Sequence, residues 1–224
     1  MIGIYNYTVI LTYVGMVVAF AGISWTIDGR STLGVICLLV AGLCDMFDGA
    51  VANTRERTKQ EKRFGIQIDS LSDLISFGVL PVVIALREIP FDKITSTSSG
   101  IYLLCALIRL AYFNVSEEER QDTEEGQREY YYGLPVTMSA IIIPITYGLA
   151  RWTNVRMRFV WPGLLLFIAI LFISPFKVKK LHFFKSQAAE SRRMAREYAR
   201  KKRLAEKNNT APAEDENEDE NRPD

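Results

Sequence analysis

The sequence predicts an all-α integral membrane protein, a bundle of six transmembrane helices followed by a basic cytoplasmic helix and a disordered acidic tail. Three observations favour this fold class. Hydrophobic residues make up 49% of the 224 residues, and they form long runs without the polar face that soluble amphipathic helices show. Charged residues, 24% of the chain, stand between these runs and at the C-terminal end. The formal net charge of +1 therefore conceals apolar segments and very polar ones.

Six apolar runs account for the predicted spans, because about 20 apolar residues cross the hydrocarbon core of a bilayer. The fourth run is the weakest candidate for a span, because it is short and carries Arg109. Prolines in or beside the last two runs are compatible with membrane helices, since neighbouring helices can satisfy the freed backbone groups. The runs are residues 7–25, 33–44, 65–86, 101–115, 134–150 and 159–173.

The segments between the runs are polar. They are a turn at residues 28–30, a basic loop at 53–64, a polar patch at 92–99 and a highly charged loop at 116–132. Six spans put both termini on one side of the membrane, together with the loops after the second and fourth spans. These segments and the tail hold most of the lysine and arginine, so the positive-inside rule places them, and both termini, in the cytoplasm.

Three parts are expected along the chain: a membrane domain over residues 1–175, a basic cytoplasmic helix over 176–207 and a disordered tail over 208–224. The second part is rich in Ala, Glu, Arg and Lys. Its basic face could lie on an anionic leaflet, and a solvated charged helix is the alternative. The last part has no aromatic or branched aliphatic residue, which is typical of disorder.

The cysteines show no metal-ligand spacing and no disulfide framework. Cys37, Cys44 and Cys105 all lie inside apolar stretches, so we interpret them as small buried hydrophobic residues. The single histidine, His182, has no cysteine or second histidine nearby. A zinc site is not expected.

Four aspartates stand near the facing ends of the second and third runs. An ionisable side chain inside a span costs about 2.5–3.5 kcal/mol, and four could cost on the order of 10 kcal/mol together. Asp45 and Asp48 are three residues apart, and Asp69 and Asp73 are four apart. On a helix each pair projects from one face. Since both helices enter the same end of the bundle, the four carboxylates can converge.

Converging carboxylates repel one another unless cations lie among them. A ligand set made only of oxygen atoms suits magnesium, manganese or calcium and not zinc. Magnesium and manganese commonly bind phosphate oxygens, and a pair of such ions can stabilise both the attacking and the leaving oxygen in a displacement at phosphorus. The aspartates therefore predict a divalent metal site, with two ions, that acts on a phosphate.

Small residues accompany the aspartates. Gly49 and Ala52 follow Asp48, and Gly65 precedes Asp69 by four residues. Taken alone, they are ordinary packing residues, which let helices approach closely. Taken with the aspartates, they suggest a nucleotide-sized slot beside the metals.

The stretch DMFDGAVANTRERTKQEKRFGIQIDSLSD, residues 45–73, resembles the signature of the CDP-alcohol phosphotransferase family. That signature reads Asp, two residues, Asp-Gly, two residues, Ala-Arg, a variable loop, Gly, three residues, Asp, three residues, Asp. Seven of its eight fixed positions match in order, and the loop is longer by a few residues. The stretches IQIDSLSDLISFGVLP, RLAYFNV and YYGLPVTMSA resemble the phosphatidylserine synthase branch. The resemblance covers roughly the first 175 residues.

The resemblance implies an enzyme that transfers a phosphatidyl group from CDP-diacylglycerol to L-serine and releases CMP. Asp45, Asp48 and Asp69 would bind Mn²⁺ or Mg²⁺ ions that hold the pyrophosphate. Asp73 would complete the metal site and act as the general base on the serine hydroxyl. The resemblance also implies a six-span homodimer in the cytoplasmic (plasma) membrane, with the site open to the cytoplasm. Its partners would be the two substrates and membrane lipid, and no nucleic acid.

By the same resemblance, Gly49, Ala52 and Gly65 would line the cytidine slot. One position departs from the signature, because Asn53 stands where the family has arginine. That arginine would be expected to meet the phosphates. We hypothesise that Arg55, two residues further on, supplies the missing charge.

Arg109 and Asn114 are candidates for binding the acceptor alcohol. Arg109 has two interpretations: a side chain that extends from a span end to the membrane surface, or a cation that holds a phosphate or the serine carboxylate. Asn114 could contribute to the same pocket.

Three other functions remain open from the sequence. The acceptor could be glycerol phosphate or inositol phosphate, although such anions favour several arginines and the spans offer few besides Arg109. A metal-ion channel or transporter would need acidic residues near the midplane of several spans. An inactive scaffold is suggested by Asn53, but the four aspartates would then be retained at a cost in stability.

Overall fold

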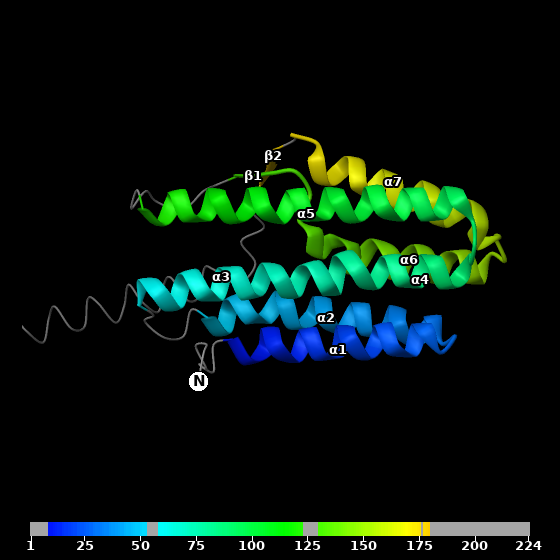
Figure 1. The fold of residues 1–224 in the computed structure, drawn as a ribbon, viewed down its shortest axis with the longest axis horizontal. Helices are drawn as coiled ribbons and strands as arrows, with labels where there is room; N and C mark the ends of the chain where they lie inside the picture. Colours follow the sequence, from blue (N-terminus) through cyan, green and yellow to red (C-terminus); the bar gives the residue numbers. More distant parts are fainter. Residues whose placement is uncertain (1–8, 53–57, 123–129, 176, 180–224) are drawn as a thin grey trace, which may run out of the picture. The chain divides into compact units, whose positions relative to one another are not determined.

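The computed structural model describes residues 9–52, 58–122, 130–175 and 177–179. In this part of the chain, the α-helices run side by side along a common direction (Figure 1). A π-helical segment, η2 (Leu74–Val79), and a 3₁₀ turn, η3 (Val136–Met138), complete the helical structure. The α-helices are α1 (Ile10–Ile27), α2 (Ser31–Ala52), α3 (Lys59–Asp73), α4 (Leu80–Glu88), α5 (Lys93–Asp122), α6 (Ser139–Trp152) and α7 (Met157–Ile173).

The described helices have the length and composition of membrane spans. Four stretches are long and apolar enough to cross a bilayer: Ile10–Ile27, Ser31–Asp48, Gln60–Glu88 and Lys93–Glu119. Two shorter apolar helices cover Val136–Trp152 and Met157–Ile173. The prediction of a helical, multi-pass membrane protein is confirmed for the described residues, and the count of six spans stays a prediction.

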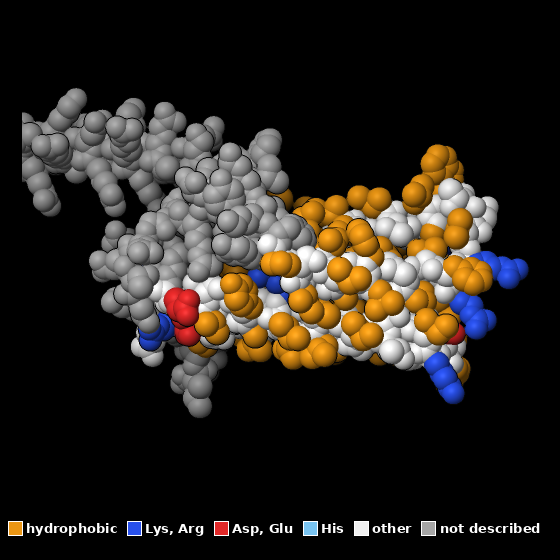
Figure 2. Space-filling model, turned by 90° about the horizontal axis from the view of Figure 1, so that it is seen from above, with side chains coloured by type: hydrophobic (Ala, Val, Ile, Leu, Met, Phe, Trp, Pro, Cys, Tyr) orange, Lys and Arg blue, Asp and Glu red, His pale blue; other side chains and the backbone are white. Residues whose placement is uncertain are grey.

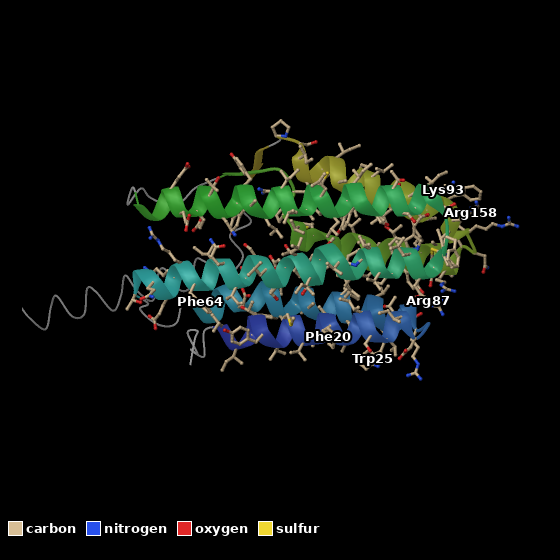
Figure 3. The ribbon with its side chains drawn as sticks, in the orientation of Figure 1. Phe20, Trp25, Phe64, Arg87, Lys93 and Arg158 are labelled. Atoms are coloured by element: carbon tan, nitrogen blue, oxygen red, sulfur yellow. The ribbon has the colours of Figure 1, made fainter. Side chains whose placement is uncertain are left out.

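The outer surface of the helices is apolar, as lipid contact requires. Hydrophobic side chains are spread over the face shown in Figure 2, and Lys and Arg lie mostly toward its two ends. Phe20 and Trp25 on α1 are 62% and 40% exposed. Figure 3 shows Arg87, Lys93 and Arg158 together at one end of the helices. Isolated large apolar residues are normal on any surface, but a continuous apolar cover indicates a membrane environment.

The interior is packed by aromatic and branched side chains from several helices. Trp161 and Phe172 of α7, Tyr102 of α5 and Phe77 of η2 are each at most 2% exposed. The Tyr102 hydroxyl donates a hydrogen bond to the Phe77 carbonyl oxygen at 2.5 Å. This bond satisfies a backbone group of the π-helical turn, where the regular α-helical pairing is interrupted.

The prediction that the cysteines are buried is confirmed for two of the three. Cys37 and Cys105 are buried free thiols, and Cys44 is a partly buried one. They are packing residues, as the apolar runs around them predicted.

The basic loop predicted at 53–64 is wrong in its second half, because α3 already begins at Lys59. Thr58 caps this helix. Its backbone N–H donates to Glu61 Oε2 at 2.8 Å, and the Glu61 N–H donates to Thr58 Oγ1 at 3.2 Å. This reciprocal pair is a capping box, which stabilises a helix start that hydropathy alone does not reveal.

The polar patch at 92–99 is largely helical, because α5 already begins at Lys93. Thr95, Ser98 and Ser99 are 0–2% exposed, so these hydroxyl groups lie inside the bundle. The same helix continues to Asp122, past the predicted end of the fourth span. Its 30 residues span about 45 Å, and the fourth span is therefore not short.

A two-stranded antiparallel pair was not expected. Strand β1 (Tyr130–Tyr132) pairs with β2 (Lys177–Lys179), with Tyr131 opposite Val178. The sequence predicted a charged loop for the first strand and the start of the basic segment for the second. The rest of the predicted basic helix and acidic tail, residues 180–224, lies outside the described residues, so the three-part division stays a prediction.

The start of α5 gives a prediction on pH-dependent stability. Asp92 Oδ2 accepts hydrogen bonds from the Thr95 backbone N–H at 2.9 Å and from Thr95 Oγ1 at 2.8 Å. These bonds, followed by the charge of Arg158, lower the pKa of Asp92 in the folded protein. A lowered pKa stabilises the fold above the unfolded-state pKa, about 3.9, and this contribution is lost as pH falls through the folded-state value.

We therefore expect Asp92→Ala to lower the Tm at pH 7 by about 2–4 °C, the shift that one lost capping interaction produces in a chain of this size. The difference in Tm between Asp92→Ala and the unmodified protein should become smaller below pH 4. Thermal unfolding followed by circular dichroism at pH 7 and pH 3 would measure both. An equal Tm difference at both pH values would contradict the role of the Asp92 charge.

Candidate metal centre

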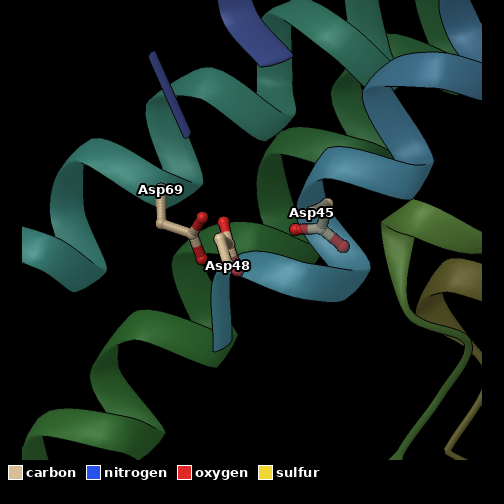
Figure 4. A group of neighbouring side chains, drawn as sticks. All are labelled: Asp45, Asp48 and Asp69. Atoms are coloured by element: carbon tan, nitrogen blue, oxygen red, sulfur yellow. The ribbon is translucent and has the colours of Figure 1, made fainter. Parts of the chain in front are cut away.

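The aspartates of the second and third runs converge in the structure. Asp45 and Asp48 lie near the C-terminal end of α2, and Asp69 and Asp73 lie in the second half of α3. One carboxylate oxygen from each of Asp45, Asp48 and Asp69 lies within 4.8 Å of the others. Figure 4 shows Asp69 and Asp48 pointing toward one another, with Asp45 one turn away on α2.

The fourth aspartate belongs to the same cluster. The side chain of Asp73 contacts that of Asp45, and the side chain of Asp69 contacts that of Asp48. All four residues are partly buried. Two contacts between α2 and α3 therefore run through pairs of carboxyl groups, an arrangement that like charges disfavour without a neutralising partner.

The helices bring these side chains together through their own periodicity. Residues three or four apart share a helix face, so each aspartate pair projects in one direction. The α1 helix packs against both α2 and α3. The sequence spacing therefore predicted which residues share a face, and the packing of three helices turned the two faces toward each other.

The donor set fits a divalent cation that prefers oxygen ligands. It contains carboxylate oxygens at a spacing that one ion can bridge, and a partly buried position where repulsion between them is poorly screened by water. Mg²⁺, Mn²⁺ and Ca²⁺ take such ligands, whereas Zn²⁺ sites in proteins are built mainly from His and Cys.

Asn114 is placed against the same helix as two of the aspartates. The Ser70 hydroxyl donates to Asn114 Oδ1 at 2.6 Å, and Asn114 Nδ2 donates to Gln67 Oε1 at 3.3 Å. Ser70 follows Asp69 directly in α3. The predicted acceptor-binding residue therefore lies beside the aspartate-bearing turn of α3 and links it to α5.

Arg109 is buried in the middle of α5, with 7% of its surface exposed. Its Nε donates to the Leu134 carbonyl oxygen at 3.1 Å. A side chain that extended to the membrane surface would be exposed, so the burial argues against that interpretation. Arg109 instead ties α5 to the segment that leads into α6.

The predicted nucleotide slot is only partly within the described residues. Gly65 lies in the second turn of α3. Gly49 and Ala52 lie in the last turns of α2, where the backbone alone is described. Asn53 and Arg55 lie outside the described residues. The slot and the compensating charge of Arg55 therefore stay predictions.

Sequence reasoning missed one residue of the cluster, Thr12. Its Oγ1 donates to Asp48 Oδ2 at 3.2 Å from helix α1. A threonine in an apolar run gives no signal of its own, because its hydroxyl can always bond within its own helix. Only the contact between α1 and α2 reveals it.

Comparison with known proteins adds the following findings. A sequence model of the family described as "CDP-alcohol phosphatidyltransferase" matches residues 5–174. A CDP-diacylglycerol–serine O-phosphatidyltransferase from Saccharomyces cerevisiae is 36% identical over 115 residues, which are 49% of this chain and 40% of that protein. An archaetidylserine synthase from Methanothermobacter thermautotrophicus is 31% identical over 156 residues, 69% of this chain and 61% of that protein.

A CDP-diacylglycerol–serine O-phosphatidyltransferase from Helicobacter pylori is 32% identical over 133 residues, 58% of this chain and 51% of that protein. The match thus spans about 40–61% of the length of these three relatives.

Proposed function

The chain belongs to the CDP-alcohol phosphatidyltransferase family, and on this basis we propose that it transfers a phosphatidyl group from CDP-diacylglycerol to the hydroxyl of L-serine. The products are phosphatidylserine and CMP. The observation that carries the proposal is the convergence of Asp45, Asp48 and Asp69 from two membrane helices. The names of the three relatives, each a serine phosphatidyltransferase or an archaetidylserine synthase, favour serine as the acceptor.

Asp45, Asp48, Asp69 and Asp73 would hold the divalent metal, Mn²⁺ or Mg²⁺ in two positions. When bound, such ions neutralise phosphate oxygens and so reduce the barrier to attack at phosphorus. Without them, the four carboxylates would repel the pyrophosphate of the substrate. The cluster is therefore suited to this substrate only as a metal-loaded site.

Asp73 would also act as the general base. A serine hydroxyl is a poor nucleophile at neutral pH, so a carboxylate within hydrogen-bonding reach must accept its proton. The serine oxygen then bonds to the phosphorus that carries diacylglycerol, and the bond from that phosphorus to the CMP oxygen breaks. The proton passes to an Asp73 carboxylate oxygen, and CMP leaves with the bonding electron pair.

The proposed position of the site suits an amphiphilic substrate. Asp45 and Asp48 lie near the C-terminal end of α2, and Asp69 and Asp73 lie in the first half of the continuous helical stretch Gln60–Glu88. With the site in that half, acyl chains can stay in hydrocarbon while serine and CMP exchange with water. We propose six spans in the plasma membrane, both termini and the site on the cytoplasmic side, and a homodimer. The lysine and arginine of the loops support this orientation.

Other residues would serve the two substrates. Gly49, Ala52 and Gly65 would line the cytidine slot, with Arg55 near the phosphates. Arg109 and Asn114 would help to hold the acceptor. Of these, the buried guanidinium of Arg109 has the charge that a serine carboxylate requires.

The decisive experiment is an acceptor test with the purified protein in detergent or lipid. With CDP-diacylglycerol and Mn²⁺, labelled serine is expected to enter lipid and CMP to be released in equal amount. A chelator should abolish both, and added Mn²⁺ should restore them. Glycerol phosphate and inositol phosphate serve as alternative acceptors in parallel reactions.

The outcomes separate the acceptor from the chemistry. CMP release with glycerol phosphate or inositol phosphate, and none with serine, would keep the reaction and contradict the acceptor. No CMP release with any of the three alcohols would contradict the transfer reaction itself. Activity that survives complete chelation would contradict the metal site.

A further inference from the structure

Helix α1 packs closely against the aspartate-bearing end of α2. A Cβ atom added to Gly15 would lie 3.3 Å from the Cβ of Cys44, the residue before Asp45. Thr12 precedes Gly15 by three residues and therefore lies on the same face of α1. The missing side chain at Gly15 allows the backbones to come together, which brings the Thr12 hydroxyl within reach of α2.

Thr12 is joined to both aspartate-bearing helices. Its hydroxyl donates to Asp48 Oδ2 at 3.2 Å, and its backbone carbonyl accepts a hydrogen bond from Ser72 Oγ at 3.4 Å. Ser72 directly precedes Asp73. Thr12 is 8% exposed and Ser72 is 8% exposed, so both contacts are shielded from solvent and lipid. One residue of α1 thus connects the turn that carries Asp48 with the turn that carries Asp73.

The Thr12 hydroxyl does not make the bond within its own helix that several other threonine hydroxyls make. Thr26, Thr146 and Thr153 each donate to the carbonyl oxygen four residues earlier in their own helix, at 2.7–2.8 Å. That local bond satisfies a hydroxyl in an apolar helix at no further cost. The Thr12 hydroxyl instead donates to a carboxylate of a neighbouring helix. A charged acceptor makes this bond stronger than a neutral one.

We propose that Thr12 is a positioning residue of the metal centre, and that it holds Asp48 in the orientation that binds the cation. The hydroxyl occupies one side of Asp48 Oδ2, which limits rotation of the carboxylate and leaves its other oxygen lone pairs to face Asp69 and Asp45. The contact from Ser72 holds the α3 side of the centre to the same residue. This inference rests on the metal site of the proposed function and adds a residue from a third helix to it.

Outer contacts that orient metal ligands typically change metal affinity by 10- to 100-fold. The test is a direct Mn²⁺ titration of the metal-free protein in detergent, with free Mn²⁺ measured by electron paramagnetic resonance and no substrate present. Thr12→Val removes the hydroxyl and preserves the shape, and it should weaken Mn²⁺ binding about 10- to 100-fold. Thr12→Ser keeps the hydroxyl and should bind within a few-fold of the unmodified protein.

Thr26→Val is the matched control, because it removes a buried threonine hydroxyl from the same helix at a position that bonds to Gly22 and not to an aspartate. Its Mn²⁺ affinity should be unchanged. Thr12→Ala provides a second variant without the hydroxyl. It must weaken Mn²⁺ binding as Thr12→Val does, which guards against an effect of the valine methyl group on folding.

The outcomes distinguish this inference from the function on which it rests. Unchanged Mn²⁺ affinity in both Thr12→Val and Thr12→Ala, with loss of binding in Asp48→Asn, would overturn the role of Thr12 and leave the metal site intact. If Thr12→Val, Thr12→Ser and Thr26→Val all weakened Mn²⁺ binding equally, the cause would be altered helix packing. That result would also overturn the role of Thr12. No Mn²⁺ binding by the unmodified protein would overturn the metal site and the inference together.

Discussion

Asp73→Asn is expected to reduce the rate of phosphatidyl transfer by about 10²–10⁴-fold, the range that a positioned general base contributes. Asparagine has nearly the same shape as aspartate but neither its charge nor its ability to accept the proton of serine. Asp73 contacts Asp45 inside the carboxylate cluster, so the substitution also removes a negative charge from the proposed metal site. CMP release with saturating Mn²⁺ would measure the rate.

A comparison with Asp48→Asn separates the two roles of the cluster. Asp48 is one of the three residues whose oxygens lie within 4.8 Å of one another, so its loss should raise the Mn²⁺ concentration required for half-maximal activity. Asp73→Asn should instead lower the rate even when Mn²⁺ is saturating. Asp92→Asn is the control, since Asp92 caps α5 and belongs to no part of the cluster.

The general-base role would be wrong if excess Mn²⁺ restored full activity to Asp73→Asn. Such rescue would mean that Asp73 only contributes charge to the metal site. A rate in Asp73→Asn equal to that of Asp92→Asn would contradict both roles.

The second large effect is expected from the packing of α2, which bears Asp45 and Asp48, against α6. A Cβ atom added to Gly42 would lie 2.5 Å from the Cβ of Ala140 in α6, far closer than two carbon atoms can approach. Gly42→Ala must therefore push α2 and α6 apart. Overpacking of this kind typically costs about 1–3 kcal/mol, and Asp45 lies three residues further along α2. We expect a lower Tm and a loss of transferase activity.

A second substitution, at Ala140, should compensate for Gly42→Ala. Gly42→Ala combined with Ala140→Gly moves the methyl group from one helix to the other and should recover most of the lost Tm. Gly148→Ala in α6 is the control, because its added Cβ would meet no atom within 4 Å; it should leave the Tm unchanged or slightly raised. Thermal unfolding of the unmodified protein, Gly42→Ala, Ala140→Gly and the double variant gives a double-mutant cycle. A double variant no more stable than Gly42→Ala would contradict direct contact between these positions.

Helix boundaries show where sequence reasoning on hydropathy stops. Apolar runs identified the helices, because burial in lipid depends on the composition of each segment. They misplaced the starts of α3 and α5, which begin in polar sequence at Lys59 and Lys93. The signal at α3 was present in the sequence as the capping box of Thr58 and Glu61. At α5 it was Asp92, three residues before Thr95.

The sequence by itself determined the class of the protein and which carboxylates of its candidate site share a helix face. Both follow from local properties: long apolar runs require a membrane, and carboxylates three or four residues apart share a helix face. The motif over residues 45–73 indicated the family that the match over residues 5–174 shows.

Only the tertiary structure decided which helix supports the aspartates and how the bundle accommodates them. The bond from Thr12 to Asp48 joins residues 36 positions apart, and that from Tyr102 to Phe77 joins residues 25 apart. Nothing in the sequence pattern around Thr12 or Tyr102 marks either residue as the donor of such a bond. Such contacts depend on how closely and at what rotation the helices pack, which glycines such as Gly15 and Gly42 permit. These distances arise from the whole bundle, because each helix is positioned by all the others that it touches.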